Sequence, residues 1–211
     1  MFEWVLYFFG ILLLIALLLT SRSFKPSAII MSVVFGTVIY VLHGFLWLFV
    51  IFLFMGVSLY ATHSLKKDDE KKHEIREVDN VISNGLVAFM SAVFNFPIMY
   101  LGSISAALAD TLSSEIGSTS NKTPRMILNI TKQVPKGTNG GITIMGLLAA
   151  ILGAGIIATL AFLFSASFSS MISSTRIFIA VFIAGILGSI IDSILGAVFE
   201  NKRQMSNGSV N

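Results

Sequence analysis

The sequence predicts an all-α membrane protein with about seven transmembrane helices in one domain. Of its 211 residues, 55% are hydrophobic and 12% are charged, whereas a soluble domain usually carries about a quarter charged residues. The mean hydropathy of +0.86 agrees with this bias. Mostly apolar runs of the length that crosses a bilayer, about 20 residues, recur along the chain. Most of the surface is therefore expected to face lipid, and the absence of cysteine excludes disulfides and thiolate sites.

The N-terminal part of the chain, residues 1–63, contains three predicted spans. They occupy residues 2–20, 27–42 and 44–61. The first run lacks the basic start and the small-residue cleavage site of a signal peptide, so we interpret it as a true span. A hydrophilic segment of mixed charge, residues 64–77, follows the third span, and its simplest interpretation is a solvated cytoplasmic loop.

Residues 78–200 contain four further predicted spans. They occupy residues 78–96, 98–116, 141–164 and 176–199, and a re-entrant or interfacial segment is the alternative for residues 78–96. Pro97 separates the first two, because proline removes a backbone donor and ends or kinks a helix. A polar loop at residues 117–140 separates the two pairs of spans, and residues 201–211 are expected to form a polar, disordered tail.

The basic residues give an independent prediction of orientation. Cytoplasmic loops of membrane proteins are enriched in Lys and Arg. With the N-terminus outside and the C-terminus in the cytoplasm, every one of the 14 basic residues except Arg176 falls on the cytoplasmic side. Because the spans were assigned from hydropathy alone, this agreement supports the seven-span topology. We therefore expect an integral protein of the cell (plasma) membrane with its working surface facing the cytoplasm.

Three carboxylates lie within predicted spans, where ionisable residues are costly and usually functional. Asp110 and Glu115 lie near the cytoplasmic end of the fifth span, and Asp192 lies deeper in the seventh. Asn84, near the start of the fourth span, belongs to the same membrane level. Glu115 is close enough to the helix end that simple solvation is an alternative. Small residues surround Asp192 at helical spacing, which favours a packed seam between helices; they are Gly185, Gly188, Ser189, Ser193 and Gly196.

The loop between the fifth and sixth spans combines basic residues with a glycine-rich turn. Arg125 and Lys136 supply positive charge, and the run Gly137-Thr138-Asn139-Gly140-Gly141 leads directly into a predicted helix. Backbone N–H groups and the helix dipole at such a terminus favour an anion. Carboxylates and a phosphate at one site are compatible when a divalent cation such as Mg²⁺ bridges them. The alternative is an ordinary basic inner loop. The sequence contains no Walker motif and no zinc-ligand spacing.

Five sequence blocks, taken together, resemble one known family over more than half of the chain. The blocks are residues 80–85, 109–117, 124–125, 135–143 and 188–197. The chain resembles the integral membrane family that includes the plant phytyl-phosphate kinase and its archaeal and bacterial relatives. Leu112 stands where the family commonly has tryptophan, and Glu200 where it commonly has glutamine. Neither departure touches the polar core of the pattern.

The resemblance implies an enzyme, a Mg²⁺-dependent kinase that phosphorylates a prenyl monophosphate to the diphosphate. The related dolichol and phytol kinases and CDP-diacylglycerol synthase favour CTP, so CTP is expected over ATP as the nucleoside triphosphate. The resemblance assigns a metal site to Asp110, Glu115 and Asp192. It assigns contacts with the nucleotide phosphates to residues of the loop and of the fourth span, namely Asn84, Arg125, Lys136, Gly137, Thr138, Asn139, Gly140 and Gly141. Asp110, Asp192 and Lys136 are the expected catalytic residues.

Two other functions fit some of the same residues. A lipid-phosphate cytidylyltransferase would use the same metal and phosphates but attack a different phosphorus atom, and the residues alone do not separate it from a kinase. A transporter would also use intramembrane carboxylates, but the polar groups cluster at one membrane face rather than at the midplane. No nucleic-acid partner is expected. Glycine faces serve contacts within and between chains equally, so the sequence favours no oligomeric state.

Overall fold

Six long helices make up most of the described part of the chain. The computed structural model describes Val5, Tyr7, Phe8, residues 10–12, Ile15, residues 25–65 and residues 78–200. The long helices are α2 (Pro26–His43), α3 (Phe45–Leu65), α5 (Val78–Val93), α6 (Pro97–Thr119), α7 (Ile144–Leu163) and α9 (Ser174–Leu195). A short helix, α8 (Ser165–Phe168), precedes α9, and a π-helical turn, Gly196–Glu200, follows it. Most of the first predicted span, residues 66–77 of the predicted cytoplasmic loop and the predicted tail at residues 201–211 lie outside the described residues.

Four of the described helices are long and apolar enough to cross a membrane, which confirms a helical membrane protein. They are Pro26–His43, Phe45–Leu65, Ile144–Leu163 and Ser174–Phe199. The apolar part of α5 is shorter, at Val81–Val93. Helix α6 has 23 residues, but its serines, threonines and two carboxylates lower its hydropathy. The total of seven spans and the orientation in the membrane stay predictions.

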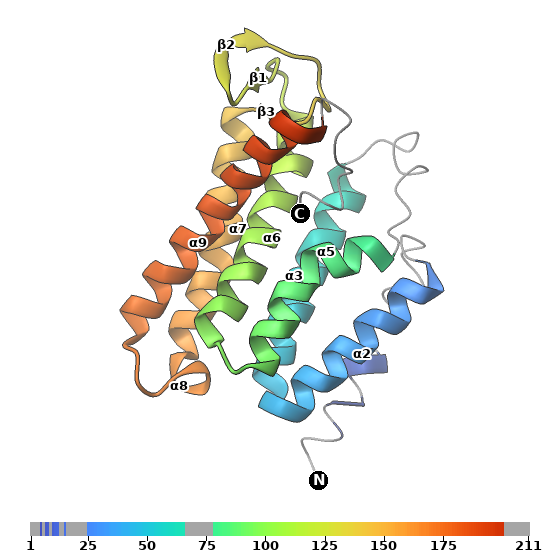
Figure 1. Ribbon diagram of the computed structural model, residues 1–211, viewed down its shortest axis with the longest axis vertical. Helices are drawn as coiled ribbons and strands as arrows, with labels where there is room; N and C mark the ends of the chain where they lie inside the picture. The colour runs from blue at the N-terminus through green and yellow to red at the C-terminus, as the bar shows by residue number, and fades with distance from the viewer. Residues whose placement is uncertain are drawn as a thin grey trace.

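The proline break between the fourth and fifth predicted spans is confirmed. Helix α5 ends at Val93, and α6 begins at Pro97, where proline is favoured because the first helical N–H has no partner within the helix. The turn uses Asn95 at a φ of 57°, a conformation that asparagine adopts more readily than most residues. Figure 1 shows that this turn reverses the chain, so that α5 and α6 run in opposite directions.

The predicted polar loop, together with the first two residues of the predicted sixth span, contains a small antiparallel sheet, which adds strands to the expected all-α fold. Helix α6 continues to Thr119, and the strands β1 (Arg125–Met126), β2 (Asn129–Gln133) and β3 (Gly141–Ile142) follow in the spatial order β2-β1-β3. Figure 1 shows this sheet over the end of the molecule where α6 and α9 end and α7 begins. The sheet therefore closes one end of the three-helix group.

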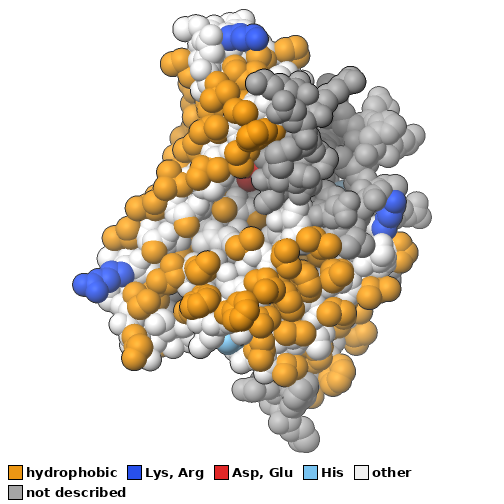
Figure 2. Space-filling model, viewed as in Figure 1, with side chains coloured by type: hydrophobic (Ala, Val, Ile, Leu, Met, Phe, Trp, Pro, Cys, Tyr) orange, Lys and Arg blue, Asp and Glu red, His pale blue; other side chains and the backbone are white. Residues whose placement is uncertain are grey.

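The outer surfaces of the helices are hydrophobic, as expected for contact with lipid. Figure 2 shows apolar side chains across most of the visible face, with Lys and Arg at its periphery and acidic atoms in a recess. Leu152 on α7 is 63% exposed, and Ile191 on α9 is 52% exposed. Exposed apolar area of this extent marks an interaction surface, and here the bilayer covers it.

Candidate functional site

A pair of carboxyl groups within the helical bundle forms the centre of the candidate site. The side chains of Asp110 on α6 and Asp192 on α9 lie within hydrogen-bonding reach of each other. Two ionised carboxylates this close together repel each other unless they share a proton or a cation lies between them. Of the three carboxylates predicted to be functional, these two are therefore brought together. The pair can hold either a proton or a cation.

Small residues on both helices bring the two aspartates together. One turn before the pair, a Cβ on Gly188 would overlap the Cβ of Ala106, so the two backbones pass very close to each other. Residues four positions apart lie on the same face of a helix, and Asp192 and Asp110 each follow this contact by four positions. The glycine face predicted around Asp192 thus sets the register between α6 and α9.

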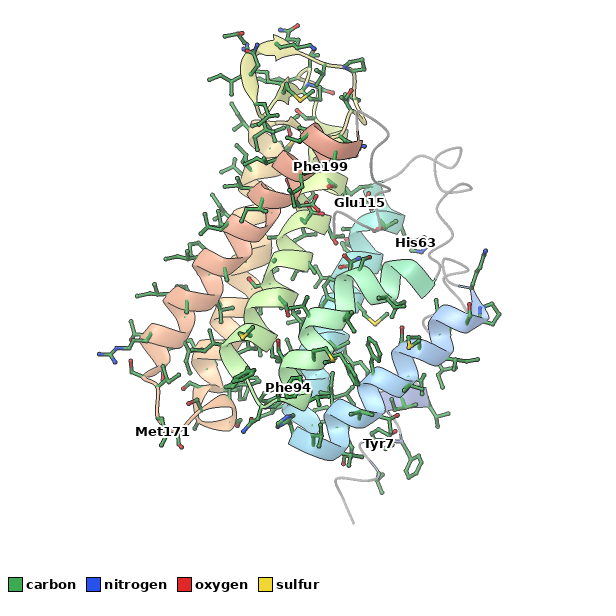
Figure 3. The ribbon with its side chains drawn as sticks, viewed as in Figure 1. Tyr7, His63, Phe94, Glu115, Met171 and Phe199 are labelled. Atoms are coloured by element: carbon green, nitrogen blue, oxygen red, sulfur yellow. The ribbon has the colours of Figure 1, made fainter. Side chains whose placement is uncertain are left out.

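Glu115 lies apart from the aspartate pair and contacts a different helix. Its side chain is buried, at 7% exposure, although the sequence left solvation open. Oε1 of Glu115 accepts a hydrogen bond of 2.8 Å from the Thr62 hydroxyl on α3. Figure 3 shows Glu115 and His63 near the same end of the bundle as Phe199. Helix α6 continues for another turn beyond Glu115, which explains its burial.

The predicted three-carboxylate metal site is not assembled within the described residues. No group of three His, Asp or Glu side chains gathers there in a geometry that could hold a metal ion. Asp110 and Glu115 are five positions apart, so they point to different sides of α6. The described arrangement therefore offers two carboxylates to a cation, and Glu115 connects α6 to α3 instead.

The glycine-rich turn packs against the end of α9 close to Asp192. A Cβ on Gly140 would overlap Ala197 and would lie 2.9 Å from the backbone oxygen of Ser193. Gly140 also has a φ of +76°, a region that side chains other than glycine rarely occupy. Ser193 directly follows Asp192 in the chain, so the predicted phosphate-binding turn packs on α9 where the helix continues beyond this aspartate.

Part of the polar backbone of the turn is already paired within the loop. The Thr143 hydroxyl caps α7 and accepts a hydrogen bond of 3.0 Å from the Gly146 N–H. The Gly141 N–H donates to the Thr138 carbonyl, and the Ile127 N–H donates to the Gly140 carbonyl. The capping threonine and these bonds hold the turn in a fixed shape.

The two basic residues predicted to bind phosphate are exposed and make local hydrogen bonds. Lys136 Nζ donates to the Ser118 carbonyl at 3.1 Å, near the C-terminus of α6, where a cation is favourable because of the helix dipole. Arg125 Nη1 donates to the Ile130 carbonyl at 2.7 Å, across the hairpin. Each of these bonds stabilises the loop, and each side chain reaches a surface that a phosphate could approach.

Asn84 and Asn139 occupy different parts of the described structure. Asn139 is exposed within the glycine-rich turn. Asn84 on α5 lines an apolar pocket between α2, α3, α5 and α6. The sequence patterns did not single out Thr62 and Thr143, whose hydroxyls pair with Glu115 and with the start of α7. The sixth span was predicted to begin at Gly141, but α7 begins at Ile144. A threonine close to a predicted helix start is a signal that would have identified Thr143 as the cap.

Comparison with known proteins places residues 9–211 of the chain in one family. The family described as "Integral membrane protein DUF92" matches residues 9–211 of the chain. An "Uncharacterized membrane protein MJ0933" from Methanocaldococcus jannaschii is 37% identical over 152 residues, which are 68% of this chain and 63% of the relative. "Protein PGR" from Arabidopsis thaliana is 49% identical over 63 residues, which are 30% of this chain and 21% of that protein.

The chain thus spans less than two thirds of the length of both curated relatives. No solved structure matches the chain. The arrangement of the helices and of the aspartate pair therefore rests on the structure described above, and the matches establish the family and its place in the membrane.

Proposed function

Since the chain belongs to the integral membrane family DUF92, the membership that its sequence blocks predicted, we propose that it is an isoprenoid-phosphate kinase. It transfers the terminal phosphoryl group of a nucleoside triphosphate, preferably CTP, to a prenyl monophosphate of the phytyl or geranylgeranyl type. Resemblance of the five sequence blocks to the phytyl-phosphate kinase family supports this substrate class. The reaction takes place at the cytoplasmic membrane face.

The close approach of the Asp110 and Asp192 side chains is the observation that carries the proposal. Two acidic side chains facing each other inside an apolar bundle are energetically costly, and such residues usually serve a function. A glycine-rich turn with basic neighbours packs against α9 at Ser193, the residue after Asp192. Phosphoryl transfer depends mainly on positioning and on neutralising phosphate charge, and this combination supplies groups for both.

The aspartate pair has the donor chemistry that Mg²⁺ requires. Mg²⁺ usually binds one or two protein carboxylates and completes its shell with water and substrate phosphate oxygens. Asp110 and Asp192 would hold the ion, and Glu115 would support α6 through its bond to Thr62. When bound, Mg²⁺ would neutralise the negative charge of the nucleotide phosphates. Lys136, Arg125 and the backbone of residues 137–141 would hold the same phosphates from the loop side.

A phosphate oxygen of the lipid is the nucleophile in the proposed reaction. It forms a bond to the terminal phosphorus of the nucleotide, and the bond between that phosphorus and the bridging oxygen breaks. The products are a prenyl diphosphate and a nucleoside diphosphate. Because the lipid phosphate is already ionised near neutral pH, no strong general base is needed, which suits a site built without histidine.

A product assay in detergent tests the proposal. Purified protein receives Mg²⁺, either labelled CTP or labelled ATP, and geranylgeranyl or phytyl monophosphate. We expect prenyl diphosphate and nucleoside diphosphate to form in equal amounts. Release of pyrophosphate with a CDP-linked lipid would replace the kinase with a cytidylyltransferase. Absence of turnover with both nucleotides and several lipid phosphates would contradict both enzymes, and a transporter would then be tested.

A further inference from the structure

An apolar pocket lies between the N-terminal helices α2 and α3 and the helices α5 and α6, which carry two of the sequence blocks described above. Its cavity volume is about 80 Å³, and the pocket opens to the surface. Residues from α2, α3, α5 and α6 line it, and apart from Ser32, Asn84 and Gly85 these residues are apolar: Phe35, Ile39, Ile51, Phe54, Met55, Leu59, Val81, Ala88 and Ile104. The hydroxyl of Ser32 donates to the Ala28 carbonyl at 2.9 Å, so its hydrogen is not available to a ligand.

The pocket has one wall of aromatic rings and one of small residues. Phe35 on α2 stacks on Phe89 on α5, with ring centroids 4.2 Å apart. Gly85 and Ala88, also on α5, leave space beside these rings. A Cβ on Gly85 would come no closer than 3.7 Å to the Phe35 ring. The shape therefore suits a slender hydrocarbon chain that lies along α5, between α2 and α3.

The pocket leads toward the level of the candidate site. Leu59 lines it on α3, and one turn further along that helix Thr62 donates to Glu115. Ile104 lines it on α6, about 9 Å of helix rise before Asp110. Asn84, the one side-chain amide of the lining, is also one of the residues predicted to contact phosphate. A lipid with its head at the aspartate level would thus extend its tail into this pocket.

We propose that this pocket binds the prenyl tail of the lipid substrate, and that α2 and α3 thereby determine the chain length that the enzyme accepts. The inference rests on the proposed function for the chemistry of the head group. It gives the N-terminal helices, which carry no recognisable motif, a defined role. Burial of an apolar chain among these side chains supplies binding free energy in proportion to the buried area.

A photo-reactive lipid tests the location of the tail without any need for turnover. The probe is a geranylgeranyl monophosphate that carries a diazirine at the end of its tail, added to the full-length protein in detergent and mapped by mass spectrometry. We expect cross-links to peptides of α2, α3 and α5. A second apolar groove, on α7 and α9 and lined by Leu152, Gly155 and Phe182 among others, is the competing location. Cross-links confined to that groove would overturn the inference.

A matched pair of glycine variants tests the role of the pocket. Gly85→Leu fills the space beside Phe35, whereas Gly56→Leu on α3 points into open space, with no atom within 4 Å of its Cβ. We expect Gly85→Leu to reduce cross-linking of the long-chain probe by about tenfold, within the range that pocket contacts discriminate. Gly56→Leu is expected to leave it unchanged. Equal cross-linking in both variants and the wild type would contradict the inference.

The two readouts separate this inference from the proposed function. If Gly85→Leu lowers turnover of a geranylgeranyl substrate but not of a geranyl substrate, both ideas are supported. If no nucleotide gives turnover and cross-linking still depends on Gly85, the kinase is contradicted while the tail pocket stands. If turnover occurs with cross-links only to α7 and α9, the kinase activity is supported and the tail-binding role of the pocket is contradicted. If Gly85→Leu does not fold, the test uses Gly85→Ala together with the cross-linking pattern of the wild-type protein.

Discussion

The helices on the two sides of α6 are packed in different ways. On one side, α7 and α9 approach so closely that an added methyl group would meet backbone: a Cβ on Gly153 would lie 2.9 Å from the Ala109 Cα. On the other side, α2, α3 and α5 pack through large side chains and leave a pocket. Close backbone approach fixes the register that pairs Asp110 with Asp192. Looser packing through large side chains leaves room for a flexible ligand.

The difference assigns two tasks to two regions. The group formed by α6, α7 and α9, together with the small sheet, holds the polar chemistry in a fixed geometry. The group formed by α2, α3 and α5 surrounds the apolar pocket. If this division is right, substitutions in the first region change turnover or folding, and substitutions in the second change substrate preference.

The largest effect is expected for the aspartate pair. Asp110→Asn and Asp192→Asn each keep the shape of the side chain but remove its charge, so the pair can no longer hold a cation. We expect the turnover number to fall by about 100-fold or more, the scale reported for removal of a single electrostatic group at an active site. Steady-state kinetics in detergent measure this, with size-exclusion profiles as the control for folding. Full activity in both variants would show that the pair has no role in the reaction.

The second prediction tests the close packing itself. A Cβ on Gly185 would overlap Ser105 and lie 2.7 Å from the Ala154 Cβ, whereas a Cβ on Gly155 has a single neighbour at 3.9 Å. Gly185→Ala should lower the free energy of unfolding by about 1–3 kcal/mol through overpacking. Gly155→Ala should raise it by about 0.5–1 kcal/mol, the gain in helix propensity. Thermal unfolding in detergent measures both, and shifts of the same sign would contradict the packing described here.

The third prediction separates packing from backbone strain in the glycine-rich turn. Gly137 and Gly140 both have a positive φ, of 80° and 76°, but only Gly140 contacts α9, since no atom lies within 4 Å of a Cβ on Gly137. Gly140→Ala should displace the turn from the aspartate pair and raise the KM for the nucleotide by about tenfold, equivalent to 1.4 kcal/mol. Gly137→Ala introduces similar backbone strain but should change the KM for the nucleotide much less. An equal effect of both variants would indicate strain alone.

The fourth prediction concerns Lys136, which has a structural partner and a proposed functional one. Lys136→Ala removes its bond to the Ser118 carbonyl and the positive charge beside the turn. Because exposed bonds of this kind add little stability, we expect thermal stability to stay almost unchanged while the nucleotide KM rises about fivefold to tenfold. Lys132→Ala, on the exposed strand β2, is the control. An unchanged KM would remove Lys136 from the nucleotide site.

The smallest effect is expected at the far end of the interface between α3 and α6. The Tyr100 hydroxyl donates to the Trp47 carbonyl at 2.5 Å, and the two rings stack with centroids 4.6 Å apart. Tyr100→Phe should lower the free energy of unfolding by about 1 kcal/mol, the usual net value of one hydrogen bond. Tyr60→Phe, at a side chain that is 74% exposed, should have no effect. Loss of activity in Tyr100→Phe at unchanged stability would show that the two regions are coupled more tightly than proposed.

Much of the helical organisation could be predicted from residues that act locally. Pro97 predicted the break between α5 and α6, since its ring restricts only the adjacent backbone. The small residues around Asp192 predicted a packed face because their spacing follows the helical repeat. The sheet in residues 125–142 was missed, because each strand is short and two of them have only two residues. Their pairing depends on contacts between distant parts of the loop.

The sequence by itself determined the membrane environment, the helical class and the residues that deserve functional tests. Apolar runs, the distribution of charge and intramembrane carboxylates are properties of the chain that need no knowledge of tertiary contacts. The tertiary structure decided which of these residues meet. Asp110 lies against Asp192, whereas Glu115 accepts a hydrogen bond from Thr62. The physical reason is that the register between α6 and α9 depends on where Gly188 meets Ala106, and no local pattern in either helix specifies its partner on the other.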